Sequence, residues 1–105
     1  MAYKVILSVG GQKDYDHTID YFLYELGNPQ AVIGLIDDFT EVANHLKHAA
    51  DSYPILSDNP KIAKRQLRKI HLKNYHYKLF YHIDGNTVYI DALIHDKRNY
   101  ESLLP

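Results

Sequence analysis

The chain has no cysteine and no tryptophan, and it has no apolar run long enough to span a membrane. The lack of cysteine excludes a disulfide framework and a thiolate metal site, and it is typical of proteins of the cytoplasm. A membrane helix needs about 20 consecutive apolar residues, so we expect no span. The apolar run near the N-terminus is too short and begins too early for a secretory signal, and it predicts a strand instead.

Acidic residues are missing from a whole section of the chain. Between Pro60 and Ile83 there are seven lysines and arginines and no acid, whereas residues 1–58 carry nine acids against three lysines. A patch of one sign concentrates partners of the opposite sign. The basic block therefore predicts contact with a nucleic acid or with an acidic protein, although a strand edge protected by lysine has the same composition. Its members are Lys61 and Lys64, which we expect in a loop, and Arg65, Arg68, Lys69, Lys73 and Lys78.

Length and composition are those of an ordinary globular protein. The 105 residues are 46% hydrophobic and 24% charged, and this length is close to the commonest size of a domain. We therefore expect a single domain over residues 1–105.

Two helical stripes follow one another in the first half of the chain. After Asp14 the apolar residues recur at i, i+3, i+4 and i+7, at Ile19, Phe22, Leu23 and Leu26. Gly27 ends this helix, and Asn28-Pro29 begins the next as N-cap and first helical residue. The second stripe continues to residue 46. Because the connection is so short, the two helices must be antiparallel neighbours.

The remaining elements are strands. Residues 3–8 form the first, and residues 67–72, 75–83 and 87–95 form three more after a loop of about ten residues at 51–60. Asp84-Gly85-Asn86 is a strong hairpin signal between the last two strands. The predicted fold class is α+β, in the order β-α-α-β-β-β, with a helical hairpin packed on a small, mostly antiparallel sheet.

The hairpin signal also predicts which residues share a face of the sheet. With Gly85-Asn86 as the turn, the buried face holds the pairs Ile83–Val88, Tyr81–Ile90, Leu79–Ala92 and Tyr77–Ile94. The alternative turn Asp84-Gly85 shifts the pairing by two residues and keeps the same faces. The second, open face then has His76 opposite His95 and Lys78 opposite Leu93. We expect Asp96, Lys97, Arg98 and Tyr100 to follow just past the sheet.

The expected open face has the residue types that RNA cleavage without a metal requires. Such cleavage needs a base, an acid and a cation for the charge on the phosphate. Histidine transfers protons near neutral pH, and arginine holds phosphate with two donors. The candidate set is His76, Lys78, His95, Arg98 and Tyr100. A polar face on an antiparallel sheet is also expected without any function.

Other patterns are weaker. His45 and His48 are three apart on a helix, but no third ligand accompanies them, so we expect solvated surface and no metal site. Asp37, Asp38 and Glu41 predict a solvated helical face. The sequence contains no P-loop, GxGxxG, nucleophile elbow or HExxH motif, and we expect no cofactor.

Several segments together match the pattern of one family. They are Tyr24-Glu25-Leu26, Asn28-Pro29-Gln30-Ala31, Tyr53-Pro54, Asn74-Tyr75, Phe80-Tyr81 and the tail at residues 95–104. This ordered set resembles the RelE/ParE toxins of bacterial type II toxin–antitoxin modules, most of all the plasmid-stabilisation type. The resemblance implies a small cytoplasmic growth inhibitor that a co-transcribed antitoxin wraps and silences.

The resemblance implies one of two mechanisms. One branch enters the ribosome and cuts mRNA, and its strand arginine falls at Lys78, its tail arginine at Arg98 and its tyrosine near Tyr100. Lysine lacks the two-donor fork of arginine, and the glutamate base of some relatives has no counterpart. The other branch poisons DNA gyrase, is not an enzyme, and shares the long helical hairpin and the tail form His-x-basic-Arg.

The sequence favours the gyrase-directed branch. The net charge of −1 is low for a protein that binds ribosomal RNA, which usually requires excess positive charge. The basic block favours the ribosome-dependent nuclease. A third interpretation is a module that binds antitoxin and has lost its toxicity. Whether the protein is an enzyme, and whether the free toxin dimerises, stay open at this level.

Overall fold

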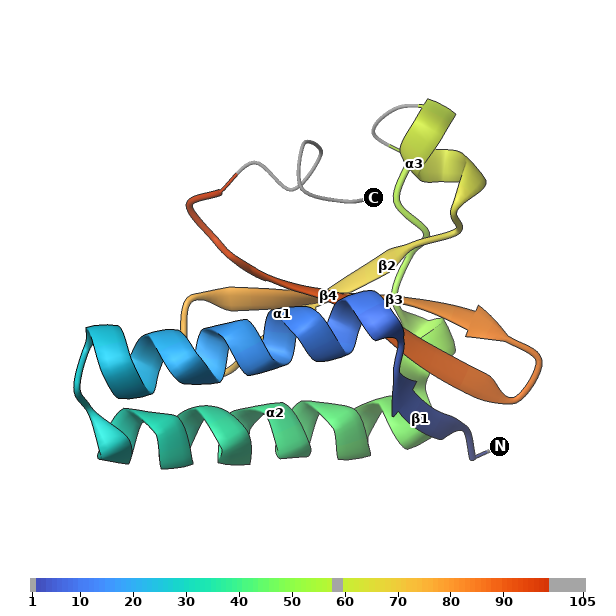
Figure 1. The fold of residues 1–105 in the computed structure, drawn as a ribbon. Coiled ribbons are helices and arrows are strands. Elements are labelled where there is room, and N and C mark those ends of the chain that lie inside the picture. The colour runs from blue at the N-terminus through green and yellow to red at the C-terminus, as the bar shows by residue number, and fades with distance from the viewer. Residues whose placement is uncertain (1, 58–59, 99–105) are drawn as a thin grey trace.

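Figure 1 shows the fold of the computed structural model, which describes residues 2–57 and 60–98. The elements in chain order are β1 (Lys4–Leu7), α1 (Val9–Asp20), a π-helical turn η1 (Tyr21–Glu25), α2 (Pro29–Ala49), a 3-10 turn η2 (Ala50–Ser52), α3 (Pro60–Lys64), β2 (Arg68–His71), β3 (Tyr77–Asp84) and β4 (Thr87–His95). Tyr100, one of the predicted site residues, lies outside the described residues.

The four strands form one mixed sheet in the order β1-β4-β3-β2. β1 runs parallel to β4, and the other neighbours are antiparallel. α1 and α2 form an antiparallel hairpin on one side of the sheet, and α3 projects on the other side (Figure 1). The predicted α+β class and the order β-α-α-β-β-β are confirmed, with α3 as an added element. No helix among the described residues is long and apolar enough to cross a membrane.

The first helix begins earlier than its apolar spacing predicts. Ser8 is the N-cap of α1, and its hydroxyl accepts a hydrogen bond from the Gly11 N–H at 3.2 Å. A side chain at Gly11 would overlap the Ile90 carbonyl, and one at Gly10 would lie 3.2 Å from the Asp91 carbonyl oxygen. The glycine pair therefore does not only stop β1: it lets the first turn of α1 lie directly against β4.

The caps of the helical hairpin are those that the sequence predicts. Gly27 has φ +57 at the end of the first helix, the left-handed conformation that glycine adopts at low cost. Asn28 caps α2, its side chain accepting from the Ala31 N–H at 3.1 Å, and Pro29 follows at the first helical position.

The β3–β4 pairing is as predicted near the turn and wrong beyond it. Ile83 pairs with Val88 and Tyr81 pairs with Ile90, but Phe80 then pairs with Ala92. Asp91 is therefore an extra residue, a β-bulge. One inserted residue turns the rest of a strand over relative to its partner. The pairs that follow are Leu79–Leu93, Lys78–Ile94 and Tyr77–His95, in place of the predicted Leu79–Ala92, Lys78–Leu93, Tyr77–Ile94 and His76–His95.

The two faces of the sheet differ from the prediction accordingly. Leu93 joins the main core between the sheet and the α1–α2 hairpin, whereas Ala92 and Ile94 lie on the second face. That face is not open throughout, because Leu67, Phe80, Ala92 and Ile94 form a second, smaller buried cluster with Leu56 packed against it.

Two local expectations are also wrong. Residues 60–64 are the helix α3 and not part of a loop, so Lys61 and Lys64 are helical. Asp38 is not solvated but only 2% exposed. Its two carboxylate oxygens accept from the Asn74 N–H at 2.8 Å and the Asn74 side-chain amide at 3.2 Å. A buried carboxylate needs such partners, and this one ties α2 to the segment between β2 and β3.

Candidate functional site

A pocket of about 590 Å³ lies between α1, the turn η1 and the ends of β3 and β4. An adjoining hollow of about 250 Å³ shares Tyr21, Tyr77 and His95 with it. The lining of the larger pocket combines imidazole, phenol, carboxylate and guanidinium groups, from Asp14, His17, Thr18, Tyr21, Tyr77, Leu93, Ile94, His95 and Arg98.

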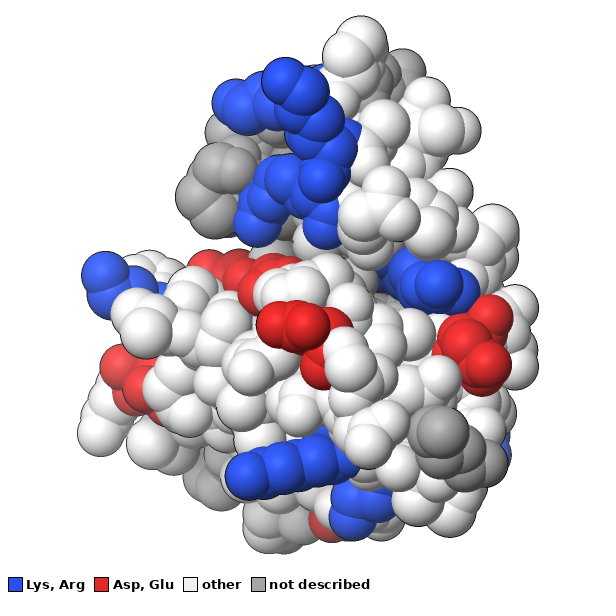
Figure 2. Space-filling view, turned by 90° about the vertical axis from the view of Figure 1, so that its right-hand side faces the viewer, with Lys and Arg blue, Asp and Glu red and all other residues white. Residues whose placement is uncertain are grey.

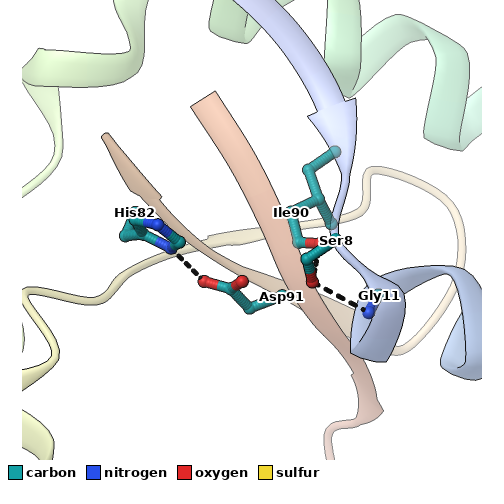
Figure 3. Close-up of polar contacts among 5 residues, drawn as sticks. All are labelled: Ser8, Gly11, His82, Ile90 and Asp91. Carbon is teal, nitrogen blue, oxygen red and sulfur yellow. Dashed lines mark hydrogen bonds and ion pairs between the residues drawn. The ribbon is translucent and has the colours of Figure 1, made fainter. Parts of the chain in front are cut away.

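The bulge at Asp91 is what delivers His95 to this pocket. Figure 3 shows the bulge held from two sides. On one side the Ser8 hydroxyl donates to the Ile90 carbonyl at 3.1 Å. On the other side Asp91, only 8% exposed, has its Oδ2 2.5 Å from Nδ1 of His82. Without the extra residue, alternation along β4 would turn His95 to the second face.

Asp14 closes the open edge of β4 within the pocket. β1 pairs with β4 only as far as Ile90, so beyond this point β4 has no strand neighbour on that side among residues 2–57 and 60–98. The Leu93 N–H instead donates to the Asp14 Oδ2 at 3.0 Å. A buried backbone donor is costly when unpaired, so Asp14 takes the place of a strand partner.

The side chains across the end of the sheet form an aromatic and cationic group. Tyr77 and His95 are direct partners, with ring centroids 5.1 Å apart at 83°. Burial raises the pKa of Tyr77, the neighbouring Tyr21 raises it further, and the Arg98 guanidinium lowers it. The net direction is upward, so the phenol is protonated near neutral pH and can donate a hydrogen bond. The pocket can thus offer a phenol, imidazoles and a guanidinium to one bound group.

The predicted catalytic or toxicity residues are only partly brought together. His95 and Arg98 line the larger pocket, and His76 lines the adjoining hollow with His95. Lys78 points to the second face, where it is 9% exposed and its Nζ lies 3.9 Å from the Asp96 Oδ1. The structure therefore separates Lys78 from His95 and Arg98.

Within the described residues, no group of three or more histidines or carboxylates could hold a metal ion. His45 is 3.0 Å from the Tyr53 hydroxyl, measured from its Nε2. This ring nitrogen therefore contacts the phenol of Tyr53, which follows the turn η2 after α2.

A family model described as "ParE toxin of type II toxin-antitoxin system, parDE" matches residues 5–100. The chain belongs to this toxin family. The match spans nearly the whole sequence, and it confirms the resemblance to RelE/ParE toxins that the sequence motifs indicate.

Solved structures of other toxins share the ParE-family fold. A chain of the chromosomal ParDE system from P. aeruginosa is 16% identical, with 90% of this chain and 96% of that chain covered and a TM-score of 0.70. A chain of the RelBE2 toxin–antitoxin complex from Mycobacterium tuberculosis is 18% identical, with 90% and 99% covered and a TM-score of 0.56. No curated protein sequence matches the chain. At these identities the structural likeness concerns the fold.

The basic block of this ParE-family chain divides into exposed and structural members. Lys61 and Lys64 on α3 are exposed, and Figure 2 shows lysine and arginine side chains gathered on the projecting upper part of the molecule. Arg68 instead donates to the carbonyls of Asp51 and Tyr53, at 3.0 and 2.6 Å.

The other members of the block are also partly engaged. Lys73 lies 3.9 Å from Glu41 on the surface, Lys78 is buried beside Asp96, and Arg65 and Lys69 are half-buried. The block is therefore not one continuous patch, and α3 is its most exposed part.

Sequence reasoning missed the half of the pocket that the helical hairpin supplies. Asp14, His17, Thr18 and Tyr21 are spaced three, four and seven residues apart, so they share one face of α1 and its continuation η1. This spacing is visible in the sequence as a polar stripe beside the apolar one. It could have been read as a candidate site only if the packing of α1 against the end of β4 had been known.

Proposed function

We propose that this toxin arrests growth by poisoning DNA gyrase and is not itself an enzyme. The proposal joins the family to the position of one side chain. The family that matches is the ParE toxins, and the gyrase-directed branch is the one that the tail His95-Asp96-Lys97-Arg98 resembles.

The observation that carries the proposal is the placement of Lys78. In the nuclease branch the corresponding strand position holds an arginine that acts on RNA, and such a group must reach a phosphate. Here the side chain of Lys78 is 11% exposed and lies beside a carboxylate, on the face of the sheet opposite to the pocket. A cation in this position already has a carboxylate beside it, and it does not share a surface with His95 and Arg98. This supports a toxin that binds its target without cleaving RNA.

Arg98 and His95 are the residues that we assign to toxicity. Arg98 is exposed, and it lies on the border of the pocket with His95. An exposed guanidinium beside aromatic rings is typical of residues that dominate protein–protein binding. In this proposal they contact gyrase directly.

Ribosome-dependent cleavage of mRNA is the second candidate, and one observation favours it. The pocket has His17 and His95 together with Tyr77 and Arg98 in its lining, which are the base, acid and cation types that metal-independent cleavage uses. In this alternative the pocket residues act on RNA and Lys78 does not.

The partner that silences the toxin is proposed to be an antitoxin with an acidic segment, and the site of action the cytoplasm. The two similar structures come from toxin–antitoxin systems. The exposed lysines of α3 offer such a segment opposite charge, together with the half-buried Arg65. The basic block is thus assigned to the antitoxin first and to a nucleic acid second.

One experiment distinguishes the targets. The toxin is induced in growing cells, and the supercoiling of a reporter plasmid and the 5′ ends of its mRNAs are followed together, with purified gyrase and relaxed plasmid as the parallel assay. We expect loss of supercoiling and gyrase-linked DNA breaks. Translation-dependent cuts within codons, with gyrase unaffected, would instead establish the nuclease. If neither effect occurs and antitoxin still binds, toxicity has been lost.

A further inference from the structure

We propose that Lys78 is a positioning residue: it acts through Asp96 to fix the turn that presents Arg98, and it does not itself contact the target. The proposal rests on the proposed function in one respect, the assignment of Arg98 to toxicity. It gives Lys78 a role different from that of the strand arginine in the nuclease branch.

Asp96 is held by charge on the second face of the sheet. Its Oδ1 is buried and accepts no hydrogen bond from the described residues. Two cationic or potentially cationic groups approach this oxygen, Lys78 Nζ at 3.9 Å and His71 Nδ1 at 3.4 Å. Of these, His71 is 58% exposed in its side chain and Lys78 only 11%. A buried carboxylate oxygen is costly without a compensating charge, so the ammonium of Lys78, the more buried of the two groups, helps to hold Asp96 in place.

The main chain connects this half-buried carboxylate to Arg98. The Asp96 N–H donates to the His76 carbonyl at 2.8 Å. This bond extends the hydrogen bonding between β3 and β4 by one residue beyond the pair Tyr77–His95. Two residues later the Arg98 N–H donates to the His95 carbonyl at 3.0 Å, and between them the Lys97 N–H donates to the His95 Nδ1 at 3.1 Å. The turn at residues 96–98 is thus held by hydrogen bonds to His95. Among its side chains, that of Asp96 contacts the sheet, through Lys78.

The geometry links opposite faces of the sheet. The ammonium of Lys78 and the carboxylate of Asp96 meet on the second face, whereas Arg98 lines the pocket beside α1. If the Asp96 carboxylate leaves this contact, the turn is held only by the hydrogen bonds of the N–H groups of residues 96–98, and the direction of Arg98 is less well fixed. Loss of the Lys78 charge therefore weakens toxicity without Lys78 touching the target.

A double-mutant cycle tests this assignment. Lys78→Met removes the ammonium beside the Asp96 carboxylate, Asp96→Asn removes the carboxylate beside the Lys78 ammonium, and the double variant removes both charges together. Lys47→Met, an exposed lysine of α2 outside the pocket, is the matched control. Growth arrest after induction, antitoxin affinity and the backbone amide shift of Arg98 in a ¹⁵N spectrum are measured for each variant.

We expect each single variant to need about tenfold more toxin for the same growth arrest, which corresponds to the coupling free energies found between residues in contact. We also expect its Arg98 amide signal to shift. The double variant should recover most of both. A direct contact between Lys78 and the target gives another pattern: the double variant stays as weak as Lys78→Met, and the Arg98 amide does not move. That pattern would overturn the proposal. Should Lys78→Met not fold, the cycle is repeated with Lys78→Gln, whose side chain retains a donor.

The amide readout separates this inference from the proposed function. It reports the turn at residues 96–98 whatever the target is. If Arg98→Ala remained fully toxic, the assignment of Arg98 to toxicity would be contradicted, while the cycle would still decide whether Lys78 holds the turn through Asp96.

Discussion

Asp91 and His82 meet across β4 and β3 at the point where β4 gains a residue, with Oδ2 and Nδ1 2.5 Å apart. The His82 ring also stacks on Tyr89 of β4, at 5.1 Å and 12°. The bulge is thereby stabilised by side-chain contacts of His82 as well as by the main chain. Since the bulge decides which face His95 takes, this pair is connected to the composition of the pocket.

Replacing His82 should therefore destabilise the protein. In His82→Ala the buried Asp91 carboxylate loses its side-chain partner, and we expect the free energy of unfolding in urea to fall by about 1–3 kcal/mol. Tyr89→Phe keeps the stacked ring and the imidazole, so it serves as the control with little change. If the free energy of unfolding falls no more in His82→Ala than in the control, the contact between His82 and Asp91 does not contribute to stability.

The glycine pair at the start of α1 gives a second prediction. In Gly11→Ala the new methyl group would overlap the Ile90 carbonyl, which is backbone and cannot rotate away. We expect destabilisation of about 3 kcal/mol, the upper end of the usual range for overpacking, because the overlapping atoms are backbone. Gly27→Ala is the matched control: nothing lies within 4 Å of its added methyl group, so it costs only the strain of φ +57, about 1 kcal/mol. Thermal or urea unfolding measures both, and equal costs would contradict the close approach.

The features that the sequence predicts correctly are those with local causes. Asn28-Pro29 and Gly27 specify their caps through their own backbone preferences, and Gly85 (φ +62) specifies the β3–β4 turn. Such signals need no knowledge of the packing, and the order of elements follows from them.

The bulge at Asp91 has no such local cause. In the sequence Asp91 continues a regular alternation with Tyr89 and Leu93, so it predicts an outward polar residue. The bulge lies against Ser8 and Gly11, about eighty residues earlier in the chain. One displaced residue then changes the partners of Lys78 and His95, which is why the predicted site was separated. Residues of α1 line the pocket because α1 packs against the end of β4. The spacing of these residues in the sequence does not reveal this packing.

Tyr81 predicts how stability responds to alkaline pH. Its hydroxyl is buried and donates to the Ala50 carbonyl at 2.7 Å, and burial raises its pKa well above the ordinary value for tyrosine. A folded pKa above the unfolded value of about 10 means that the stabilisation is complete below about pH 10 and is lost as the pH rises further. We expect the free energy of unfolding to fall by up to about 1.4 kcal/mol per pH unit there.

Tyr81→Phe isolates this contribution. The variant should lose about 1 kcal/mol near pH 7 with the hydrogen bond, and its stability should fall less steeply above pH 10. Tyr24→Phe, at a side chain 75% exposed, is the control and should reproduce the wild-type curve. Urea unfolding at pH 7, 9, 10 and 11 gives the comparison, and parallel wild-type and Tyr81→Phe curves would assign the alkaline slope to other tyrosines.

Arg98 should separate toxicity from antitoxin binding. The guanidinium is exposed at the pocket, and the basic residues of α3 are a different surface, so Arg98→Ala should abolish growth arrest while antitoxin affinity changes by less than about tenfold, the scale of a single rim charge. Growth curves after induction and calorimetric titration measure the two effects. Lys47→Ala controls for the loss of one positive charge, and full toxicity of Arg98→Ala would exclude the assignment.

The exposed lysines of α3 should make antitoxin binding sensitive to salt. Surface charges interact over about 10 Å at 0.1 M salt and about 3 Å at 1 M, so affinity should fall as sodium chloride rises from 0.05 to about 0.5 M. In Lys61→Ala/Lys64→Ala the low-salt affinity should drop about tenfold, at about 0.5–1 kcal/mol for each exposed pair, and the salt dependence should flatten. The double variant Lys4→Ala/Lys47→Ala removes the same charge from exposed positions away from α3 and should behave as the wild type. If both double variants keep the same steep salt dependence, the proposed contact between α3 and an acidic antitoxin segment is excluded.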